Sequence, residues 1–337
     1  MRITLRQPTN DLHTRWLVGL ENSRLRLYSG GFQEITDPRT GIPFRSGTFV
    51  GESYVRDIVS LFLTAETRVG NGVVRIHYGG RVDHYSDFGF QVTPRVGVVV
   101  APTDRFALKA LYGRAFRAPS VFETRGDGTD IGANDTLRPE EIDTFELVAV
   151  RESERFRAQA TAFASLWREA IILVPVTDPA VTSRYDNAGR NHAFGAEASL
   201  TYARGPARVE SSASYIRSWN DSEGVEYRAF PKLIANLGVG VDVASARLSF
   251  FAFQRLTAGS TIGDPVSTTF LRDQRTLPVY YRVDLQARWE AIDDRLSVTV
   301  TVRNLFDRNN TAPSLTNAQY GQPGTPINAS IGVSGEI

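Results

Sequence analysis

The chain has 337 residues, and its 38 basic side chains are nearly balanced by 37 acidic ones, so a net charge of +1 does not favour nucleic acid or an acidic substrate. It contains no cysteine and four scattered histidines (His13, His77, His84 and His192), which excludes a disulfide framework, thiolate metal sites and a cysteine nucleophile. Mean hydropathy is -0.22, and no apolar run approaches the roughly 20 residues that a membrane helix needs, so membrane insertion would require strands.

Alternating apolar and polar residues predict one large all-β domain of fifteen antiparallel strands, each paired with its neighbours in sequence. The strands are expected near 1–7, 12–27, 54–69, 73–84, 91–101, 105–116, 142–151, 155–169, 192–203, 207–219, 231–242, 246–256, 280–290, 295–304 and 325–335. Tight turns are expected at 8–11, 70–72, 102–104, 152–154, 204–206, 243–245 and 291–294. Longer connections are expected at 28–53, 85–90, 117–141, 170–191, 220–230, 257–279 and 305–324. Short turns on one rim and long loops on the other are typical of a bacterial outer-membrane barrel, whereas Greek-key sandwiches alternate less regularly.

The clearest alternation lies in a hairpin from Tyr281 to Arg303. Its strands carry one apolar face and one charged or hydroxyl-bearing face. In a soluble sandwich the apolar face would meet a core, while in a membrane barrel it would meet lipid and the charged face would line a wet lumen. Tyr281 and Trp289 bracket the apolar face where two interfacial girdles would lie, which favours the barrel.

Other strands repeat the pattern, with some departures. His77 shares a face with Arg75, Arg81 and Asp83, which indicates a lumen-facing polar residue rather than a metal ligand. Aromatic residues break the alternation in two strands, where they fall on the polar side or on both faces: Phe163, Trp167, Phe250, Phe251 and Phe253.

Several phrases resemble the β-barrel domain of TonB-dependent outer-membrane receptors. They are Leu111–Glu123, followed by Asn134 and 137–146, with Val92–Val98 before them and Asn187–Glu197, Val302–Asp307 and Tyr320–Gly324 after them. Together they cover essentially all of 54–337 in the order that the family shows. The residues that carry the family pattern are Tyr112, Gly113, Arg114, Phe116, Arg117, Pro119, Glu123, Asn134, Leu137, Pro139, Glu140, Glu146, Asn187, Gly195, Glu197, Asn304, Leu305, Phe306, Tyr320 and Gly321.

These phrases are interpreted as structural rather than catalytic. A lipid-facing or girdle set is expected at Phe106, Leu108, Ala110, Tyr112 and Phe116, and Pro119 would end the strand where a long loop begins. The acidic loop 127–130 misses the spacing of an EF-hand, so a solvated loop is favoured over a calcium site. No catalytic residue, metal site or cofactor site is proposed, and the chain is not expected to be an enzyme.

The resemblance implies a receptor of the Gram-negative outer membrane that takes up a scarce large solute such as a ferric siderophore, cobalamin or a glycan. Its partners would be outer-membrane lipid, the solute and, for a parent protein with a plug domain, the TonB energy-transducing complex. Recognition would lie in the long loops. Candidate ligand contacts there are Arg184, Tyr185, Trp219 and Tyr320.

The chain also departs from the family pattern. Residues 1–53 do not read as a plug, a coupling box or a signal peptide, the fifteen strands fall short of about 22 in plugged transporters, and the final residue, Ile337, is not aromatic. We therefore expect 1–337 to be a truncated barrel domain that does not transport alone. The alternatives are a passive outer-membrane pore, a non-functional remnant of a truncated gene, and a soluble sandwich that acts as a binding module.

Overall fold

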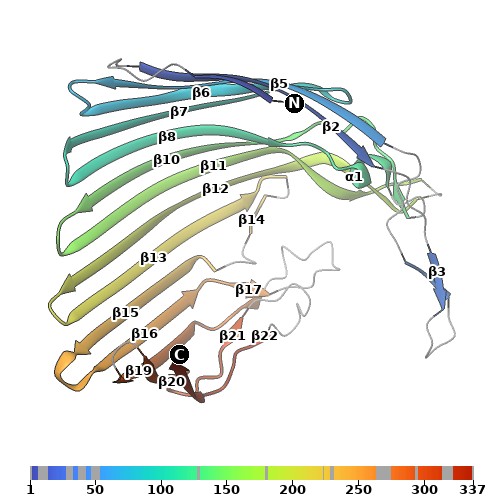
Figure 1. Ribbon diagram of the computed structural model, residues 1–337. Coiled ribbons are helices and arrows are strands. Elements are labelled where there is room, and N and C mark those ends of the chain that lie inside the picture. The colour runs from blue at the N-terminus through green and yellow to red at the C-terminus, as the bar shows by residue number, and fades with distance from the viewer. Residues whose placement is uncertain are drawn as a thin grey trace. The chain divides into compact units, whose positions relative to one another are not determined.

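The computed structural model describes residues 2–6, 14–27, 33–36, 43–46, 54–126, 130–178, 181–222, 224–227, 231–262, 275–292, 295–312 and 322–335 (Figure 1). Its long strands are β1 (Arg2–Arg6), β2 (Thr14–Leu27), β5 (Tyr54–Val69), β6 (Val74–Tyr85), β7 (Gly89–Thr103), β8 (Phe106–Arg117), β10 (Glu140–Glu152), β11 (Phe156–Pro175), β12 (Ser183–Arg204), β13 (Ala207–Asn220), β15 (Leu233–Val243), β16 (Leu248–Ala258), β19 (Tyr280–Ile292), β20 (Leu296–Arg303) and β23 (Asn328–Gly335). Each predicted strand has its counterpart among them, so the predicted antiparallel all-β fold class is confirmed.

The remaining elements are short and lie in the connections. They are β3 (Gln33–Thr36), β4 (Pro43–Ser46), α1 (Val121–Arg125), β9 (Ile131–Gly132), β14 (Val225–Tyr227), η1 (Ala244–Ala246), β17 (Thr261–Ile262), β18 (Arg275–Thr276), β21 (Thr311–Ala312) and β22 (Gln322–Pro323). None of the helices in the described part of the chain is long and apolar enough to cross a membrane.

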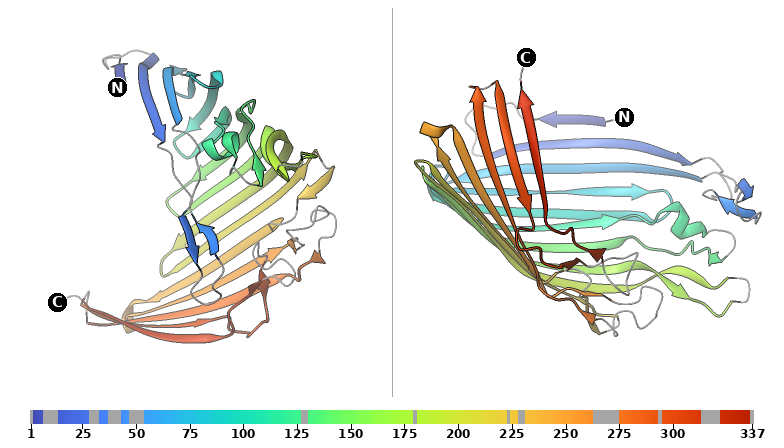
Figure 2. Two further views of the ribbon diagram at one scale, coloured as in Figure 1. Left: turned by 90° about the vertical axis from the view of Figure 1, so that its right-hand side faces the viewer. Right: turned by 90° about the horizontal axis from the view of Figure 1, so that it is seen from below.

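Two compact units make up the chain. Unit 1 contains Met1–Val100, Ala110–Phe145 and Ser165–His192, and unit 2 contains Ala101–Lys109, Glu146–Ala164 and Ala193–Ile337. In unit 1, β2 pairs antiparallel with β1 and β5, and β6 pairs with β5 and β7 (Figure 2). In unit 2 the antiparallel order is β13, β15, β16, β19, β20 and β23. Sequence neighbours therefore pair throughout these two runs, as predicted.

The two faces of unit 1 have opposite chemistry and unexpected exposure. Ser60 lies opposite Asp83, and these polar residues are 1% and 2% exposed, whereas Leu61, next in β5, is 54% exposed. A water-soluble sandwich would bury the leucine and expose the aspartate. The apolar face is thus the outward face, which is the arrangement that a hydrocarbon solvent requires.

Unit 2 repeats the division into an apolar and a polar face across five strands, although its polar row is exposed at Asp242 and Arg288. The register aligns an apolar row of Val241, Phe250, Ala287, Val300 and Ile331. The row beside it, on the opposite face, consists of Asp242, Ser249, Arg288, Thr299 and Gly332. Ile331 is 74% exposed, so the face that a soluble protein would cover lies open here as well.

Phenylalanines on the polar face pack against glycines of the neighbouring strand. A Cβ atom at Gly19 would lie 2.1 Å from Cζ of Phe62, and one at Gly238 would lie 2.7 Å from Cζ of Phe251. Phe163 occupies the same kind of space over Gly195, at 2.6 Å. Because each glycine lacks a side chain, it leaves a flat space that the phenylalanine ring fills. This accounts for the position of Phe163 and Phe251 on the polar face.

Two predicted long connections are wrong. The segment 170–191 is mostly strand, because β11 continues to Pro175 and β12 already begins at Ser183. Glu169 has φ 54°, so the backbone turns locally and the alternation that marks the strand is lost although the pairing continues. The predicted connection 85–90 is a short turn in which the rings of Tyr85 and Phe88 stack 4.3 Å apart.

Predicted tight turns fall in three groups. At 70–72 the residues Gly70, Asn71 and Gly72 all have positive φ, and the amide of Gly72 donates to the Val69 carbonyl at 3.2 Å, which confirms that turn. The strands also end next to the turns predicted at 102–104, 152–154, 204–206 and 243–245. The turns predicted at 8–11 and 291–294 lie wholly or partly outside the described residues.

Candidate ligand-facing site at the loop ends of unit 1

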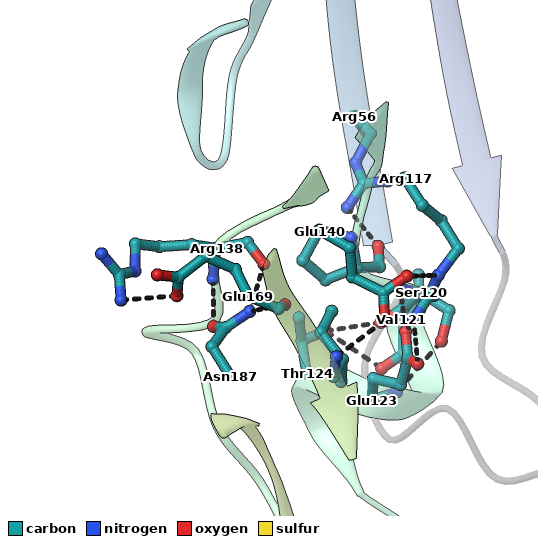
Figure 3. Close-up of polar contacts among 12 residues, drawn as sticks. Arg56, Arg117, Ser120, Val121, Glu123, Thr124, Arg138, Glu140, Glu169 and Asn187 are labelled. Atoms are coloured by element: carbon teal, nitrogen blue, oxygen red, sulfur yellow. Dashed lines mark hydrogen bonds and ion pairs between the residues drawn. The ribbon is translucent and has the colours of Figure 1, made fainter. Parts of the chain in front are cut away.

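A short helix closes the end of β8. Ser120 caps α1, since its hydroxyl accepts from the Glu123 amide at 3.2 Å while the Glu123 carboxylate accepts from the Ser120 amide at 2.7 Å (Figure 3). This reciprocal capping box stabilises a helix that is too short to persist through its own backbone bonds. Gly126 ends the helix with φ 69°, and its amide donates to the Phe122 carbonyl at 2.9 Å.

Arg117 joins the helix to two further strands. Its guanidinium lies 2.8 Å from the Glu123 carboxylate and 2.6 Å from the Glu140 carboxylate. Glu140 is 5% exposed, and its other oxygen accepts from the backbone amide of Ile171 at 2.7 Å. The end of β8, helix α1, β10 and β11 are therefore tied through two carboxylates, each of whose oxygens accepts a hydrogen bond.

The same contacts set the ionisation of Glu123. Partial burial raises the pKa of its carboxyl, but the Arg117 guanidinium and the Ser120 amide and hydroxyl outweigh burial and hold the pKa below its ordinary value. Glu123 is thus a fixed anion at neutral pH rather than a proton donor or acceptor.

Arg56, on β5, holds the backbone just before the helix. Its guanidinium pairs with Asp87 at 2.6 Å and donates to the Pro119 carbonyl at 2.9 Å. It also lies over the rings of Tyr54, Tyr85 and Phe88, at 5.2 to 5.8 Å from their centroids. Only 6% of Arg56 is exposed, so the cation is satisfied by one carboxylate, one carbonyl and three aromatic faces.

Two asparagines of the family pattern hold the loop backbone. Asn187 accepts from the amide of Arg138 at 2.7 Å and donates to the carbonyls of Arg138 and Glu169, both at 2.8 Å (Figure 3). Asn134 donates to the Tyr185 carbonyl at 2.9 Å. These side chains replace strand-to-strand backbone bonds, which explains why β11 and β12 extend through a segment that the sequence marks as a loop.

A third hub joins β8, β10 and β11. Asp143 is 4% exposed and accepts from the hydroxyl of Tyr112 at 2.8 Å and from Nε of Arg114 at 2.9 Å, and it also pairs with Arg168. The ring of Tyr112 lies 4.9 Å from that of Phe145, which is 48% exposed, so a bonded hydroxyl and an exposed aromatic contact occur together and the assignment of Tyr112 to a lipid-facing or girdle set stays a prediction. The ring of Phe116 contacts that of Tyr85 edge-on at 5.7 Å, and Tyr85 in turn lies against the guanidinium of Arg56, so Phe116 belongs to the aromatic group around Arg56.

The candidate ligand contacts are placed in different surroundings. Arg184 is exposed and pairs with Asp186 at 3.3 Å, and Tyr185 meets the ring of Phe122 edge-on at 6.0 Å, so both stand on strand β12 of unit 1 beside α1. Trp219 lies in unit 2, where it stacks on Phe194 with centroids 5.2 Å apart. Tyr320 and Gly321 lie outside the described residues.

The remaining residues of the family pattern are divided between the units. Leu137, Pro139 and Glu140 are buried near the loop end of unit 1, and Gly113 lies in β8 with open space where a Cβ would stand. In unit 2, Glu146 lies in β10, Gly195 and Glu197 lie in β12, and Asn304, Leu305 and Phe306 follow β20.

Asn304 is the hub of this last group. Asn304 is 1% exposed. Its backbone amide donates to the Asp284 carboxylate at 3.0 Å, and its side-chain amide donates to the carbonyls of Arg308 and Thr325, both at 3.0 Å. The adopted φ of 52° is one that asparagine tolerates better than most residues. Sequence reasoning named Asn304, Asn134 and Asn187 but missed Arg56, Asp143 and Asn310.

The charged groups of the loop-end site are held in fixed positions. The carboxylates of Glu123 and Glu140 pair with Arg117 and also accept from backbone amides, which leaves them as fixed charges. No cluster of three or more metal-ligating side chains occurs among the described residues. The solvent-exposed group at this loop end is the guanidinium of Arg184, which lies beside the half-buried Tyr185 and Phe122.

The chain has recognisable relatives. A family model described as TonB dependent receptor-like, beta-barrel matches residues 3–305. The iron-regulated outer membrane virulence protein of Vibrio cholerae serotype O1 is 25% identical over 270 residues, which cover 73% of this chain and 40% of the relative. The chain thus spans less than half the length of that relative.

Solved structures resemble the chain in fold. The siderophore receptor PirA from Acinetobacter baumannii matches 98% of this chain and 53% of its own chain, with a TM-score of 0.74 and 16% identity. A variant of the ferric enterobactin receptor from Pseudomonas aeruginosa matches 99% of this chain and 53% of its own, with a TM-score of 0.70 and 18% identity. The FrpB iron transporter from Neisseria meningitidis matches 98% of this chain and 53% of its own, with a TM-score of 0.74 and 15% identity.

Proposed function

The chain belongs to the TonB-dependent receptor-like β-barrel family of the outer membrane, and from this premise we propose that it forms the wall and outer recognition surface of a receptor for iron-bearing siderophores. The observation that carries the proposal is the family match over 3–305. The solute class is suggested by relatives named for iron regulation and for siderophore binding. A ferric siderophore is accordingly preferred over cobalamin or a glycan.

The side-chain contacts support a receptor wall rather than an enzyme. Ion pairs with one buried member, such as Arg56 with Asp87 and Arg117 with Glu140, hold the loop ends in fixed positions against the strands. A fixed loop end loses little conformational freedom when a solute binds, and this favours recognition of a large solute at low concentration. Arg184 and Tyr185 are the proposed contacts on this platform, because one offers a charge and the other an aromatic edge.

Active transport by this family also requires a plug domain and a contact with the TonB complex. The chain spans about half of the solved receptors that it matches, so a plug domain and the contact with the TonB complex are assigned to sequence beyond 1–337. Residues 1–337 would then be a barrel segment that recognises solute but does not move it alone.

Uptake of labelled iron tests this proposal. The chain, exported with an added signal peptide, is compared with the same barrel joined to a family plug domain, in Gram-negative cells that lack siderophore receptors. We expect iron uptake that stops when the proton-motive force is collapsed from the plugged form, and none from 1–337 alone. Steady currents through 1–337 in a planar bilayer, with no energy-dependent uptake by either form, would instead favour the passive pore.

A further inference from the structure

A small cavity lies on unit 2 where β16 ends and β19 begins. It has a volume of about 260 Å³, and its polar lining comes from Arg255, Thr257, Ser260 and Tyr280, with Leu277 and Pro278 supplying part of the apolar wall. Thr257 and Tyr280 are direct cross-strand partners, so two neighbouring strands present these groups together. A space of this size holds a small solute or one arm of a larger one.

The described residues that line the cavity carry a positive charge. Arg255 is the one charged residue among the described residues that line it, and no described carboxylate lies within ion-pair distance of its guanidinium. The remaining polar groups of the lining are hydroxyls, which can donate hydrogen bonds to an anion. An arginine beside hydroxyl donors is a typical arrangement for binding carboxylate or phosphate oxygens.

The neighbouring strand strengthens this positive potential. Arg282 lies directly opposite Arg255, and like charges in that position destabilise a sheet. Arg282 pairs with Asp284 at 2.9 Å, yet its Nε is buried without a hydrogen-bond acceptor. Among the described residues, Asp284 pairs with Arg282 and none pairs with Arg255, so an excess of positive charge lies next to the cavity.

The walls of the cavity are held in place before any solute arrives. Asn310 is 5% exposed and binds the backbone of Tyr281 twice, accepting from its amide at 3.1 Å and donating to its carbonyl at 3.0 Å. The amide of Leu277 donates to the Ser260 carbonyl at 2.9 Å. Fixed walls reduce the ordering cost of binding.

We propose that this cavity binds an oxygen-rich anion, a carboxylate or phosphate group, with Arg255 as the principal contact and Arg282 as a supporting charge. The inference rests on the proposed function in that the anion would be an acidic arm of the solute that the receptor recognises. It assigns a sign of charge to that solute: anionic iron complexes would bind here and neutral ones would not.

Calorimetric titration of the full chain in detergent tests the site with three probes. Citrate tests the carboxylate form, inorganic phosphate tests the phosphate form, and trimethyl citrate is the uncharged control. We expect binding of citrate or phosphate that weakens as salt is added, and no binding of the ester. Absence of binding by both anions would overturn the proposal.

Substitution of Arg255 identifies the contact. R255Q should weaken anion binding about tenfold or more, and R255K should retain part of it because the charge remains while the planar fork is lost. The matched control is R288Q. Arg288 lies on the face of β19 that also carries Arg282, the cross-strand partner of Arg255, but it is more than half exposed and does not line the cavity. Equal losses in R255Q and R288Q, or no loss in R255Q, would contradict the assignment.

Iron uptake separates this inference from the proposed function. If the plugged receptor takes up iron and R255Q changes neither uptake nor anion binding, the site is wrong and the function stands. If Arg255 binds citrate but no form of the receptor takes up iron, the site stands and the proposed function is wrong.

Discussion

Ser60 and Asp83 face each other across the hairpin of β5 and β6, hydrogen-bonded and almost completely buried, while the leucine beside Ser60 is more than half exposed. Arg81 donates to both, at 2.7 Å to Ser60 and 2.6 Å to Asp83, and lies 3.0 Å from Glu21. A polar face that is satisfied internally and an apolar face that is open together specify a strand with water or protein on one side and lipid on the other.

Charge on the lipid face should be costly. We expect V300R to lower the free energy of unfolding by about 2–4 kcal/mol if Val300 lies near the bilayer midplane, because an arginine there must leave water. T299R, one residue away on the polar face, should cost less than about 1 kcal/mol. Urea unfolding in lipid bilayers measures both, and equal costs would contradict the assigned faces.

The glycine beneath Phe62 should resist even a methyl group. A Cβ at Gly19 would lie 2.1 Å from the ring, so G19A should destabilise the chain by about 1–3 kcal/mol through displacement of Phe62. G332A is the matched control, since a strand glycine there has open space around the added carbon. The added F62A substitution should remove most of the cost of G19A, and a cost that persists would show that the ring is not the obstacle.

Two arginine–aspartate pairs should differ in value because one is buried. R56Q removes the cationic partner of Asp87, which keeps only the Tyr54 hydroxyl as a donor, and the donor to the Pro119 carbonyl, so it should cost about 3 kcal/mol. R24Q removes the exposed pair with Asp57 and should cost less than about 1 kcal/mol. Hydrogen exchange of the 119–126 amides provides the local measurement, and R56Q should speed it while R24Q should not. Unchanged exchange in R56Q would remove Arg56 from the support of α1.

Acid should loosen the α1 loop end through Glu123. The folded pKa of this carboxyl lies below its ordinary value of about 4.3, so its stabilisation is complete above that value and is lost as the pH falls through the lower folded pKa. Limited proteolysis at the loop end should therefore be constant from neutral pH to about 5 and should increase below about 4. E123Q should be more susceptible at neutral pH and should lose this pH dependence. A wild-type profile that matches E123Q would contradict the role of the carboxylate.

Much of the fold was predictable because period-two alternation records which face each residue takes. The hairpin from Tyr281 to Arg303 and the turn at 70–72 are local patterns, and the structure confirms both. The extension of β11 and β12 was not predictable, since it depends on Glu169 in a left-handed conformation and on Asn187 binding a segment 49 residues away. Neither feature has a periodic signature.

The site was predictable as a set of residues but not as a set of contacts. Glu123, Asn134 and Asn187 were named from their resemblance, and the structure supplies their partners. Arg56 and Asp143 were missed because their roles arise from residues that the chain brings together from distant strands. The polar-side phenylalanines were likewise unexplained until the facing glycines were located.

The central claim is that the exposed apolar face contacts lipid, and site-directed fluorescence tests it most directly. The natural chain has no cysteine, so single cysteines can be placed at Leu61, Leu63 and Thr64 and labelled in lipid bilayers that contain brominated acyl chains. Leu61 and Leu63 lie on the exposed apolar face, and Thr64 lies on the polar face with Phe62. The account predicts strong quenching by brominated lipid at 61 and 63 and weak quenching at 64. Equal quenching at the three positions, or stronger quenching at 64, would contradict it.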